Sequence, residues 1–214
     1  MLRKLLLLAL IASFLQATGQ VNDKGRLHFG LGLGLGVHAT HFEHEIGNAG
    51  IVVRNSERDG AVTFTVPIEA QLGLGPRFSL GLHLEPGSYL DSAGTRPNKL
   101  FLFGLSPRYY AVNKDRFALY LHADVGLGSL RIGEVVNGVN RYEDRYAGGH
   151  LRLGLVSQWF FSEVVGLQLG LKYAAHNLAW RERTPGDPVL NRVDYTARLR
   201  TSGVQFQLGL VAKF

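Results

Sequence analysis

In Phe78–Glu85 (FSLGLHLE), apolar residues alternate with polar or small ones. One set of alternate positions holds phenylalanine and leucines, and the other holds serine, glycine, histidine and glutamate. Successive side chains of a β-strand point to opposite faces, so this pattern predicts a strand with one apolar and one polar face. Val165–Tyr173 (VGLQLGLKY) and Val204–Leu210 (VQFQLGL) repeat the pattern.

Segments of this kind continue in both directions along the chain and predict eight β-strands. Their expected ranges are 26–43, 61–75, 78–91, 100–113, 117–135, 147–162, 164–182 and 193–214. Breaks in the alternation between Tyr173 and Trp180, and again near Ser202 and Gly203, indicate β-bulges where strands leave a membrane.

The connections between these strands alternate strictly between short and long. Short turns are expected around 76–77, 113–116 and 162–163, and longer connections near 44–60, 92–99, 136–146 and 183–192. With an even number of strands, both chain ends lie on the side of the short turns. This arrangement is typical of bacterial outer-membrane barrels, which have short periplasmic turns and long external loops.

The composition of the polar face indicates that it lines the inside of a barrel. A soluble ligand-binding barrel would show a lysine- and glutamate-rich exterior. Here the polar face is mostly small: Gly30, Gly32, Gly34, Gly36, Gly73, Gly81, Gly104, Gly126, Gly128, Gly154, Gly170 and Gly209. The apolar face extends over roughly ten residues per strand, as a tilted transmembrane strand requires. We therefore predict an all-β fold, an eight-stranded antiparallel transmembrane β-barrel with an up-and-down meander.

The N-terminus predicts export. Arg3 and Lys4 precede an apolar run from Leu5 to Leu15, and small residues follow at Ala17 and Gly19. This is the pattern of a cleaved signal peptide, so we expect residues 1–19 to be the signal and 20–214 the barrel. The alternative is a retained N-terminal anchor, for which the apolar run is short. The expected location is the outer membrane of a Gram-negative bacterium.

Composition and charge narrow the function classes. The chain has 27 glycines in 214 residues and no cysteine, which argues against helices and excludes disulfides and cysteine chemistry. Its net charge is +6, and the two basic residues of the predicted signal reduce this to +4 (21 basic against 17 acidic residues). Nucleic acid is not an expected partner, because the secretory route leads away from it.

Aromatic residues gather toward the expected strand ends. Phe78, Tyr109, Phe117, Trp159 and Phe161 lie near the short turns, and Tyr173 and Trp180 lie toward the opposite ends. Such a distribution is typical of the aromatic girdles at the two interfaces of a membrane.

The last strand ends in Phe206–Phe214 (FQLGLVAKF), with Phe206, Leu208 and Leu210 at alternate positions before the terminal aromatic Phe214. This resembles the C-terminal β-signal read by the barrel-assembly machinery. Together with Thr65–Glu69 (TVPIE) and Leu105–Tyr110 (LSPRYY), the whole mature chain resembles the PorT-like outer-membrane β-barrel domain family. In size and topology it is similar to the OmpA transmembrane domain and OmpX, without the peptidoglycan-binding domain of full-length OmpA. The resemblance implies the fold and the assembly machinery as a partner; it implies no catalytic residues.

A charge network is expected inside the barrel. Inward positions carry charges of both signs, and Tyr120, His122 and His176 share this face. An eight-stranded barrel is only just wide enough for side chains to fill it, so we expect a paired network that closes the lumen. Its predicted members are Glu69, Glu85, Arg108, Asp124, Arg152 and Lys172. The alternative is a gate or narrow solute path in which the ion pairs exchange partners.

Two further sequence patterns are candidates for a nucleotide site and a metal site. Gly30–Gly36 (GLGLGLG) resembles a dinucleotide fingerprint, but no helix follows it, so no nucleotide cofactor is expected. His38, His41, His44 and Glu45 cluster in sequence, but a spacing of three places consecutive histidines on opposite faces of a strand. We therefore expect rim histidines and no metal site.

Three function classes remain open. The first is a structural or interaction role through external loops, in envelope integrity, adhesion or assembly of a partner protein. In this class the arginines Arg181, Arg183, Arg192, Arg198 and Arg200 are candidate contacts for lipopolysaccharide phosphates. The second is a narrow gated channel. The third is a lipid-modifying enzyme, for which His176 and Asn177 lie in a suitable zone; without a GxSxG elbow or a serine two residues on, we predict no enzyme.

Overall fold

The computed structural model describes residues 20–48, 51–92, 98–136, 139–184 and 194–214. The expected signal peptide, residues 1–19, lies outside the described residues, as do Arg192 and most of the last expected loop. In the described part of the chain, no helix has the length and apolar character needed to cross a membrane.

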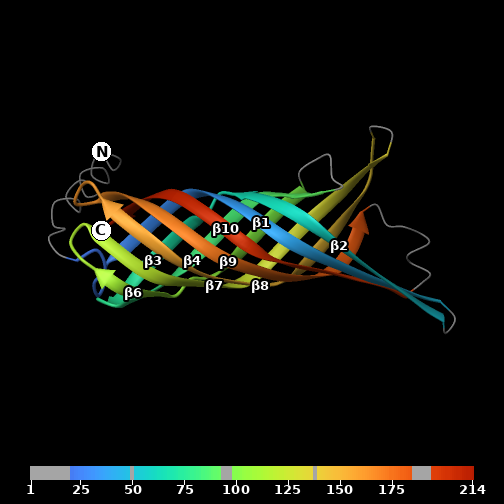
Figure 1. Ribbon diagram of the computed structural model, residues 1–214, viewed down its shortest axis with the longest axis horizontal. Helices are drawn as coiled ribbons and strands as arrows, with labels where there is room; N and C mark the ends of the chain where they lie inside the picture. Colours follow the sequence, from blue (N-terminus) through green and yellow to red (C-terminus); the bar gives the residue numbers. More distant parts are fainter. Residues whose placement is uncertain (1–19, 49–50, 93–97, 137–138, 185–193) are drawn as a thin grey trace, which may run out of the picture.

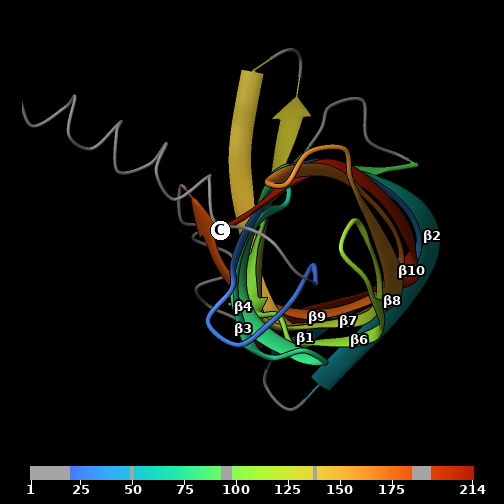
Figure 2. The same ribbon diagram turned by 90° about the vertical axis from the view of Figure 1, so that its left-hand side faces the viewer.

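Ten strand segments form one antiparallel sheet that closes on itself into a ring of eight strands (Figure 1). The segments are β1 (Leu27–Asn48), β2 (Ile51–Thr65), β3 (Ile68–Gly75), β4 (Phe78–Asp91), β5 (Asn98–Leu105), β6 (Arg108–Asn113), β7 (Phe117–Val136), β8 (Val139–Phe160), β9 (Val165–Thr184) and β10 (Asp194–Lys213). The ring closes where β1 pairs with β10, from His28 opposite Lys213 to Gly47 opposite Asp194. Figure 2 shows the closed ring from one end.

Two of the eight strands are interrupted at proline, which is why ten segments form eight strands. β2 and β3 are separated at Pro67, and β5 and β6 at Pro107. Proline has no backbone N–H, so it removes one hydrogen bond from the ladder. The carbonyls of both prolines still accept, from the N–H of Gly32 at 2.9 Å and of Ala123 at 3.1 Å, so the wall stays closed.

The apolar face of every strand points outward and the polar face points inward. On β1 the leucines from Leu27 to Leu35 are 43–56% exposed, whereas the intervening His28 is 1% exposed. The same alternation runs through β3, where Glu69 and Gln71 are buried between exposed Ile68 and Leu72. An exterior of this kind fits hydrocarbon and not water, and a closed ring leaves no backbone group unpaired at a sheet edge. The fold is the eight-stranded transmembrane β-barrel predicted from the sequence.

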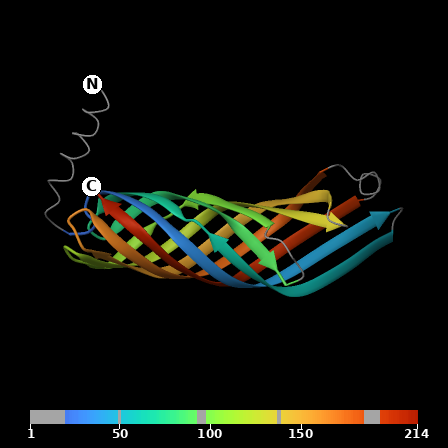
Figure 3. The ribbon, with the colours of Figure 1, turned by 90° about the horizontal axis from the view of Figure 1, so that it is seen from above.

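The strands extend further at the outer end than the sequence pattern indicated. The expected loops 44–60 and 136–146 are mostly strand, because β1 and β2 stay paired from Gly34 opposite Thr65 to Asn48 opposite Ile51, and β8 begins at Val139. Most side chains of the β1–β2 extension meet water, so it carries no apolar alternation although the backbone ladder continues. At the start of β8 the inward Asp144 and Tyr146 are buried, one polar and one apolar, so alternation is also missing there. Figure 3 shows the long β1–β2 hairpin projecting beyond the barrel.

The two predicted β-bulges were wrong. The pairing of β9 with β8 runs without a shift from Gly166 to Trp180, and that of β10 with β1 is continuous past Ser202. The alternation breaks in sequence because inward positions change from polar to apolar at the outer end, for example at Leu178 and Leu199. The register shift on this side leaves Arg181 of β9 as the extra residue, between Trp180 opposite Tyr146 and Glu182 opposite Arg145, one position beyond the predicted range.

Ring contacts at the short-turn end fit an interfacial girdle. Phe78 packs on Tyr109 with ring centroids 5.1 Å apart, and Phe117 packs on Trp159 at 5.6 Å. Trp180 does not belong to a lipid-facing girdle: its ring packs edge-on against Tyr195 and its Nε1 donates to Asp144 Oδ1 at 3.0 Å.

Candidate functional site

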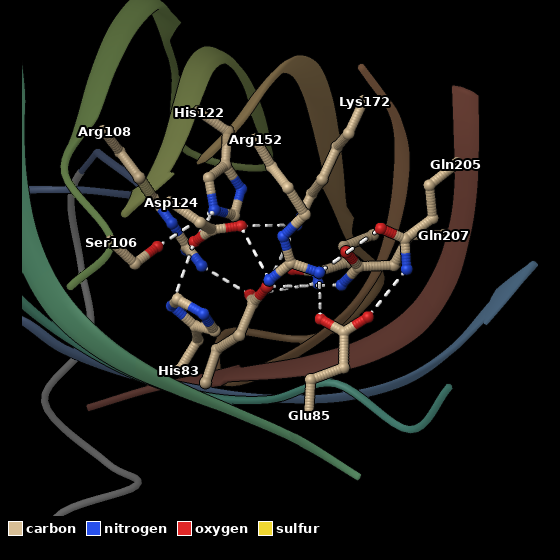
Figure 4. Close-up of polar contacts among 12 residues, drawn as sticks. His83, Glu85, Ser106, Arg108, His122, Asp124, Arg152, Lys172, Gln205 and Gln207 are labelled. Carbon is tan, nitrogen blue, oxygen red and sulfur yellow. Dashed lines mark hydrogen bonds and ion pairs between the residues drawn. The ribbon is translucent and has the colours of Figure 1, made fainter. Parts of the chain in front are cut away.

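The lumen holds a buried charge network at mid-height (Figure 4). Strand alternation turns Glu69 of β3, Arg108 of β6 and Asp124 of β7 toward the barrel axis. Arg108 Nη2 donates to Glu69 Oε2 at 2.5 Å. Lys172 of β9 lies between two carboxylates, with Nζ 3.5 Å from Glu69 Oε1 and 3.4 Å from Asp124 Oδ2. One lysine thus joins two acidic residues from different strands.

Arg152 of β8 forms the second half of the network. Its guanidinium pairs with Glu85 of β4 through Nη1 and with Asp124 Oδ2 through Nη2, the latter at 3.0 Å. Gln205 of β10 donates from Nε2 to Glu85 Oε1 at 2.7 Å. All six residues predicted for the lumen network therefore lie together, and their side chains are at most 2% exposed.

The six charges balance. Glu69, Glu85 and Asp124 are acidic, whereas Arg108, Arg152 and Lys172 are basic, so the network is neutral when all are ionised. A buried ion that loses its partner is costly, by several kcal/mol. Removal of one member would therefore leave another without its counter-charge, so the members depend on one another.

Histidine, serine and glutamine side chains complete the network, and the sequence pattern does not single out Ser106 and Gln207 among them. His122 Nε2 lies 2.7 Å from Asp124 Oδ1 and 2.9 Å from Ser106 Oγ. Gln207 donates to Glu69 Oε1 at 3.3 Å. Gln207 and Ser106 occupy inward positions, which was the signal available in the sequence, but strand parity does not show which strands face each other across the lumen.

A row of histidines adjoins this network at His83 and continues from there toward the outer end. His83 Nδ1 is 3.3 Å from Asp124 Oδ1, and its Nε2 is 3.0 Å from Nε2 of His150 across the lumen. The His150 ring neighbours that of His176, which in turn neighbours His38 at a centroid distance of 5.9 Å. The row thus spans the lumen from β4 to β1.

Above the histidines, the lumen is filled by an apolar cluster, the outer plug. Its buried members are Ala61, Tyr89, Leu100, Leu102, Leu130, Tyr146, Leu178, Ala197 and Leu199. They come from β2, β4, β5, β7, β8, β9 and β10, so the plug packs residues from almost the whole ring. Tyr89 anchors one side by a 2.8 Å hydrogen bond to Thr40.

A second apolar cluster and the segment before β1 close the opposite end. Tyr110, Tyr120 and Phe160 pack there with Val21, which is fully buried. Asn22 is fully buried, and its Nδ2 donates to the carbonyl of Gly75 at 2.6 Å. This segment has no periodic pattern in the sequence, so its burial was not predicted.

Two glycines allow that segment to enter the barrel. Gly25 has φ of 80°, a left-handed conformation that favours glycine, and its N–H donates to Gly73 O at 2.8 Å. A Cβ on Gly73 would lie 1.9 Å from the carbonyl oxygen of Asp23. Only a residue without a side chain fits at this contact.

The predicted external arginines are dispersed. Arg183 binds Asp144 through Nε at 2.9 Å and Nη2 at 2.7 Å, and Arg200 lies 3.6 Å from Glu43. Arg181 and Arg198 are exposed and have no ion-pair partner among the described residues. Arg192 lies outside the described residues. The structure therefore does not bring the four described arginines into one cluster.

The residues of the predicted assembly signal line one face of β10. Phe206, Leu208 and Leu210 are 45%, 49% and 53% exposed on the lipid-facing side. The Phe214 ring packs edge-on against Phe29 of β1, with centroids 5.9 Å apart. The backbone of Phe214 also closes the ring, because its N–H donates to Leu27 O at 2.8 Å.

The clustered histidines His38, His41 and His44 point to different places. His38 is buried in the lumen, His41 binds Glu43 at 2.9 Å, and the His44 ring neighbours Phe42. Among the described residues, no group of three or more His, Cys, Asp or Glu side chains is arranged to hold a metal ion.

His176 and Asn177, the candidates for lipid hydrolysis, point to opposite faces of the barrel wall. His176 faces the lumen and is 8% exposed, whereas its neighbour Asn177 faces outward. Ser202, opposite Ala175 on β10, has the outward parity of Asn177. A serine and a histidine on opposite faces of one sheet cannot form a nucleophile and base pair.

Comparison with known proteins places the fold in a class. No protein-family model and no curated protein matches the chain. Among solved structures, the outer membrane protein OprG from Pseudomonas aeruginosa is 10% identical, with a TM-score of 0.54 over 90% of this chain and 97% of OprG. The outer membrane protein AlkL, solved in lipid bilayers, is 11% identical, with a TM-score of 0.51 over 90% of this chain and 92% of AlkL.

The protein therefore has the fold of the small outer-membrane β-barrel proteins. At these identities the likeness concerns the fold alone. The PorT-like resemblance is not tested by these comparisons and stays a prediction.

Proposed function

We propose that the chain is an integral outer-membrane β-barrel with a closed lumen, which acts through its outer extensions in envelope integrity, adhesion or assembly of a partner. The observation that carries this proposal is the filling of the lumen at successive levels. The inner cluster, the charge network, the histidine row and the outer plug occupy it in turn. A barrel whose lumen is filled in this way is better suited to a scaffold role than to a pore.

The β1–β2 hairpin is the best candidate for an interaction surface. It extends beyond the apolar band, and its tip carries Ile51, Val52 and Val53 with exposures of 70%, 61% and 61%. Exposed apolar residues on a projecting element are typical of protein contact sites. This supports a surface or envelope protein as a partner, and Arg181 and Arg198 are proposed contacts for lipopolysaccharide phosphates.

Planar-bilayer recording tests the closed lumen. The detergent-folded protein is first checked for a β-rich circular dichroism spectrum and for faster migration on a gel when unboiled. Inserted protein is then expected to give no large, stable single-channel currents, because the charge network and both apolar clusters fill the lumen. Stable currents of the size given by a 16-stranded porin would contradict the proposal.

A narrow gated path for small solutes is the second candidate. It is favoured by Lys172, which lies at similar distances from Glu69 and Asp124 and can exchange one carboxylate for the other. In the same recordings this candidate predicts small, intermittent currents that change in Lys172→Met.

We also infer that β10 carries the signal for the barrel-assembly machinery, and that the chain belongs near the PorT-like barrels. Deleting Phe214 removes one interfacial aromatic, worth about 1.5–3 kcal/mol of burial, while the rest of β10 stays paired with β1. The truncated protein is expected to refold in detergent but to be depleted from the outer-membrane fraction of cells, as measured by fractionation. Phe29→Ala removes the ring that Phe214 contacts and keeps the C-terminus, so it serves as the control. Normal abundance of the truncated protein in the outer membrane would show that Phe214 is not part of an assembly signal.

A further inference from the structure

Polar inward-facing residues lie directly opposite one another across five neighbouring strands in the outer half of the lumen. They are His150 of β8, His176 of β9, Thr201 of β10, Thr40 of β1 and Asp59 of β2. Residues opposite each other in an antiparallel pair have Cβ atoms ~5 Å apart, and each of these side chains can donate or accept a hydrogen bond. They form a polar line, the outer line, that begins in the lumen at His150 and ends at the partly exposed Asp59.

A cavity of about 810 Å³ lies inside the lumen along the outer line. Its lining is centred on the five residues of this line and on Gly126 of β7. Thr201 Oγ1 and the Nδ1 atoms of His150 and His176 are buried and have no hydrogen-bond partner among the described residues. Buried polar atoms of this kind are typically bound to ordered water, for which such a cavity has room. Water in the cavity can therefore connect the members of the outer line.

The inner end of the outer line joins the charge network through a pair of histidines. His150 Nε2 lies 3.0 Å from Nε2 of His83, so one of these atoms carries the shared hydrogen and the other accepts it. On its other side, His83 Nδ1 lies 3.3 Å from Asp124 Oδ1 (Figure 4). An imidazole can take up a proton at one ring nitrogen and release one from the other. The two rings therefore link the cavity to Asp124.

Lys172 extends this link across the charge network. Its Nζ lies 3.4 Å from Asp124 Oδ2 and 3.5 Å from Glu69 Oε1, so it can give a proton to one carboxylate and receive one from the other. The other basic residues at these carboxylates are Arg152 on Asp124 and Arg108 on Glu69. Arginine stays protonated in proteins, so both guanidiniums hold the carboxylates in place without exchanging protons.

Polar atoms continue from Glu69 to the inner end of the barrel. Gln71 is the next inward residue after Glu69 on β3, and His28 of β1 lies opposite Gln71. Gln71 Nε2, Tyr110 OH and both ring nitrogens of His28 have no hydrogen-bond partner among the described residues, although all three residues are at most 3% exposed. They too are sites for ordered water. His28 is the second residue of β1 and lies opposite Lys213, near the end of β10, so these atoms reach the inner rim.

The same lumen is too crowded for other ions. The six members of the charge network have side chains at most 2% exposed, and apolar clusters close both ends. A hydrated cation needs an open, water-filled cross-section. A proton needs only a chain of groups that exchange hydrogens, as in the Asp, Glu and His relays of membrane transporters.

We propose that the lumen conducts protons along this path while it stays closed to larger ions and solutes. His150 Nδ1 takes up a proton from the cavity, the Nε2 proton of His150 moves to Nε2 of His83, and the Nδ1 proton of His83 moves to Asp124. Lys172 then gives a proton to Glu69 and receives one from Asp124. Each N–H or O–H bond that breaks is matched by one that forms, and reorientation of the two rings restores the starting state. The inference rests on the proposed insertion of the barrel in a membrane.

Proton flux into liposomes tests the path. The detergent-folded protein is inserted into liposomes that contain a pH-sensitive dye, with potassium and valinomycin present to balance the charge. The unaltered protein is expected to collapse an imposed pH gradient faster than protein-free liposomes do. His83→Gln and His150→Gln are each expected to slow this flux by about tenfold or more, because a glutamine amide is polar but does not relay protons as a positioned imidazole does. His44→Gln is the matched control, because His44 lies outside the cavity lining, with its ring beside Phe42, and this variant is expected to conduct as the unaltered protein does.

The outcomes separate the proton path from the proposed closed barrel. Only variants that migrate faster on a gel when unboiled are compared, and liposomes without valinomycin are expected to retain their potassium. A folded barrel with no proton flux above that of protein-free liposomes overturns the path and leaves the closed barrel intact. Equal flux in His83→Gln, His150→Gln and His44→Gln overturns the role of the histidine pair. Loss of potassium together with the pH gradient would show an open pore, which contradicts both the path and the closed lumen.

Discussion

The lumen and the outer extension both carry ion pairs between strands, but in opposite environments. In the lumen, Arg152 pairs with Glu85 and Asp124, and all three side chains are at most 1% exposed. In the extension, Arg54 pairs with Glu45, and these side chains are 75% and 39% exposed. The same chemistry is therefore buried in one region and solvated in the other.

The two environments predict different contributions of these ion pairs to stability. Buried ions have lost their hydration, so removing one partner leaves an uncompensated charge. Exposed ions are hydrated and screened by salt, so a lost partner is replaced by water. We therefore expect the barrel to depend on its lumen network, and the extension to depend on the backbone pairing of β1 with β2.

The largest expected effect comes from Arg152→Met. The variant leaves Glu85 and Asp124 without their shared guanidinium, so the free energy of unfolding should fall by about 3–5 kcal/mol. Urea unfolding of the barrel in lipid vesicles, followed by tryptophan fluorescence, measures the loss. The double variant Arg152→Met, Glu85→Met removes charges of both signs and should recover part of it. An unchanged unfolding midpoint in Arg152→Met would show that the network is not what stabilises the lumen.

The next effect should come from the outer plug. Leu178 is 1% exposed and packs in this cluster, so Leu178→Ala should leave a cavity and cost about 2–4 kcal/mol. Leu171, on the same strand, faces outward and is 58% exposed, which makes Leu171→Ala the matched control. The same urea experiment compares the two variants. Equal losses would mean that the plug packs no more tightly than the lipid-facing wall.

Strand number, strand order and the facing of side chains in the regularly alternating segments could be predicted from the sequence. Alternation is a local signal, and hydrocarbon makes it strong because it selects apolar residues on one face only. Glu69 and Lys172 could be assigned to the lumen for the same reason, since both lie at polar positions of alternating segments.

Other features depend on environments that alternation does not report. The outer plug places leucines such as Leu178 on the inward face, where the pattern predicted polar residues, and this produced the wrong bulges. The β1–β2 hairpin beyond Glu43 is largely solvated on both faces, so the sequence pattern predicts a loop there. Val21 and Asn22 belong to a short segment that has no periodic sequence pattern. Their burial depends on how this segment closes the end of the barrel, which the sequence does not indicate.

The smallest expected effect comes from the extension. Arg54→Gln removes the pair with Glu45, but both side chains are largely hydrated, so the free energy of unfolding should change by less than about 0.5 kcal/mol. Raising the salt concentration should reduce even this difference, because exposed charges more than about 8 Å apart are already screened at physiological ionic strength and close pairs weaken as salt rises. Arg145→Gln, which removes an equally exposed pair with Glu182, should behave in the same way. A loss in Arg54→Gln comparable to that in Arg152→Met would mean that the extension folds as part of the barrel core, and that burial is not what separates the two regions.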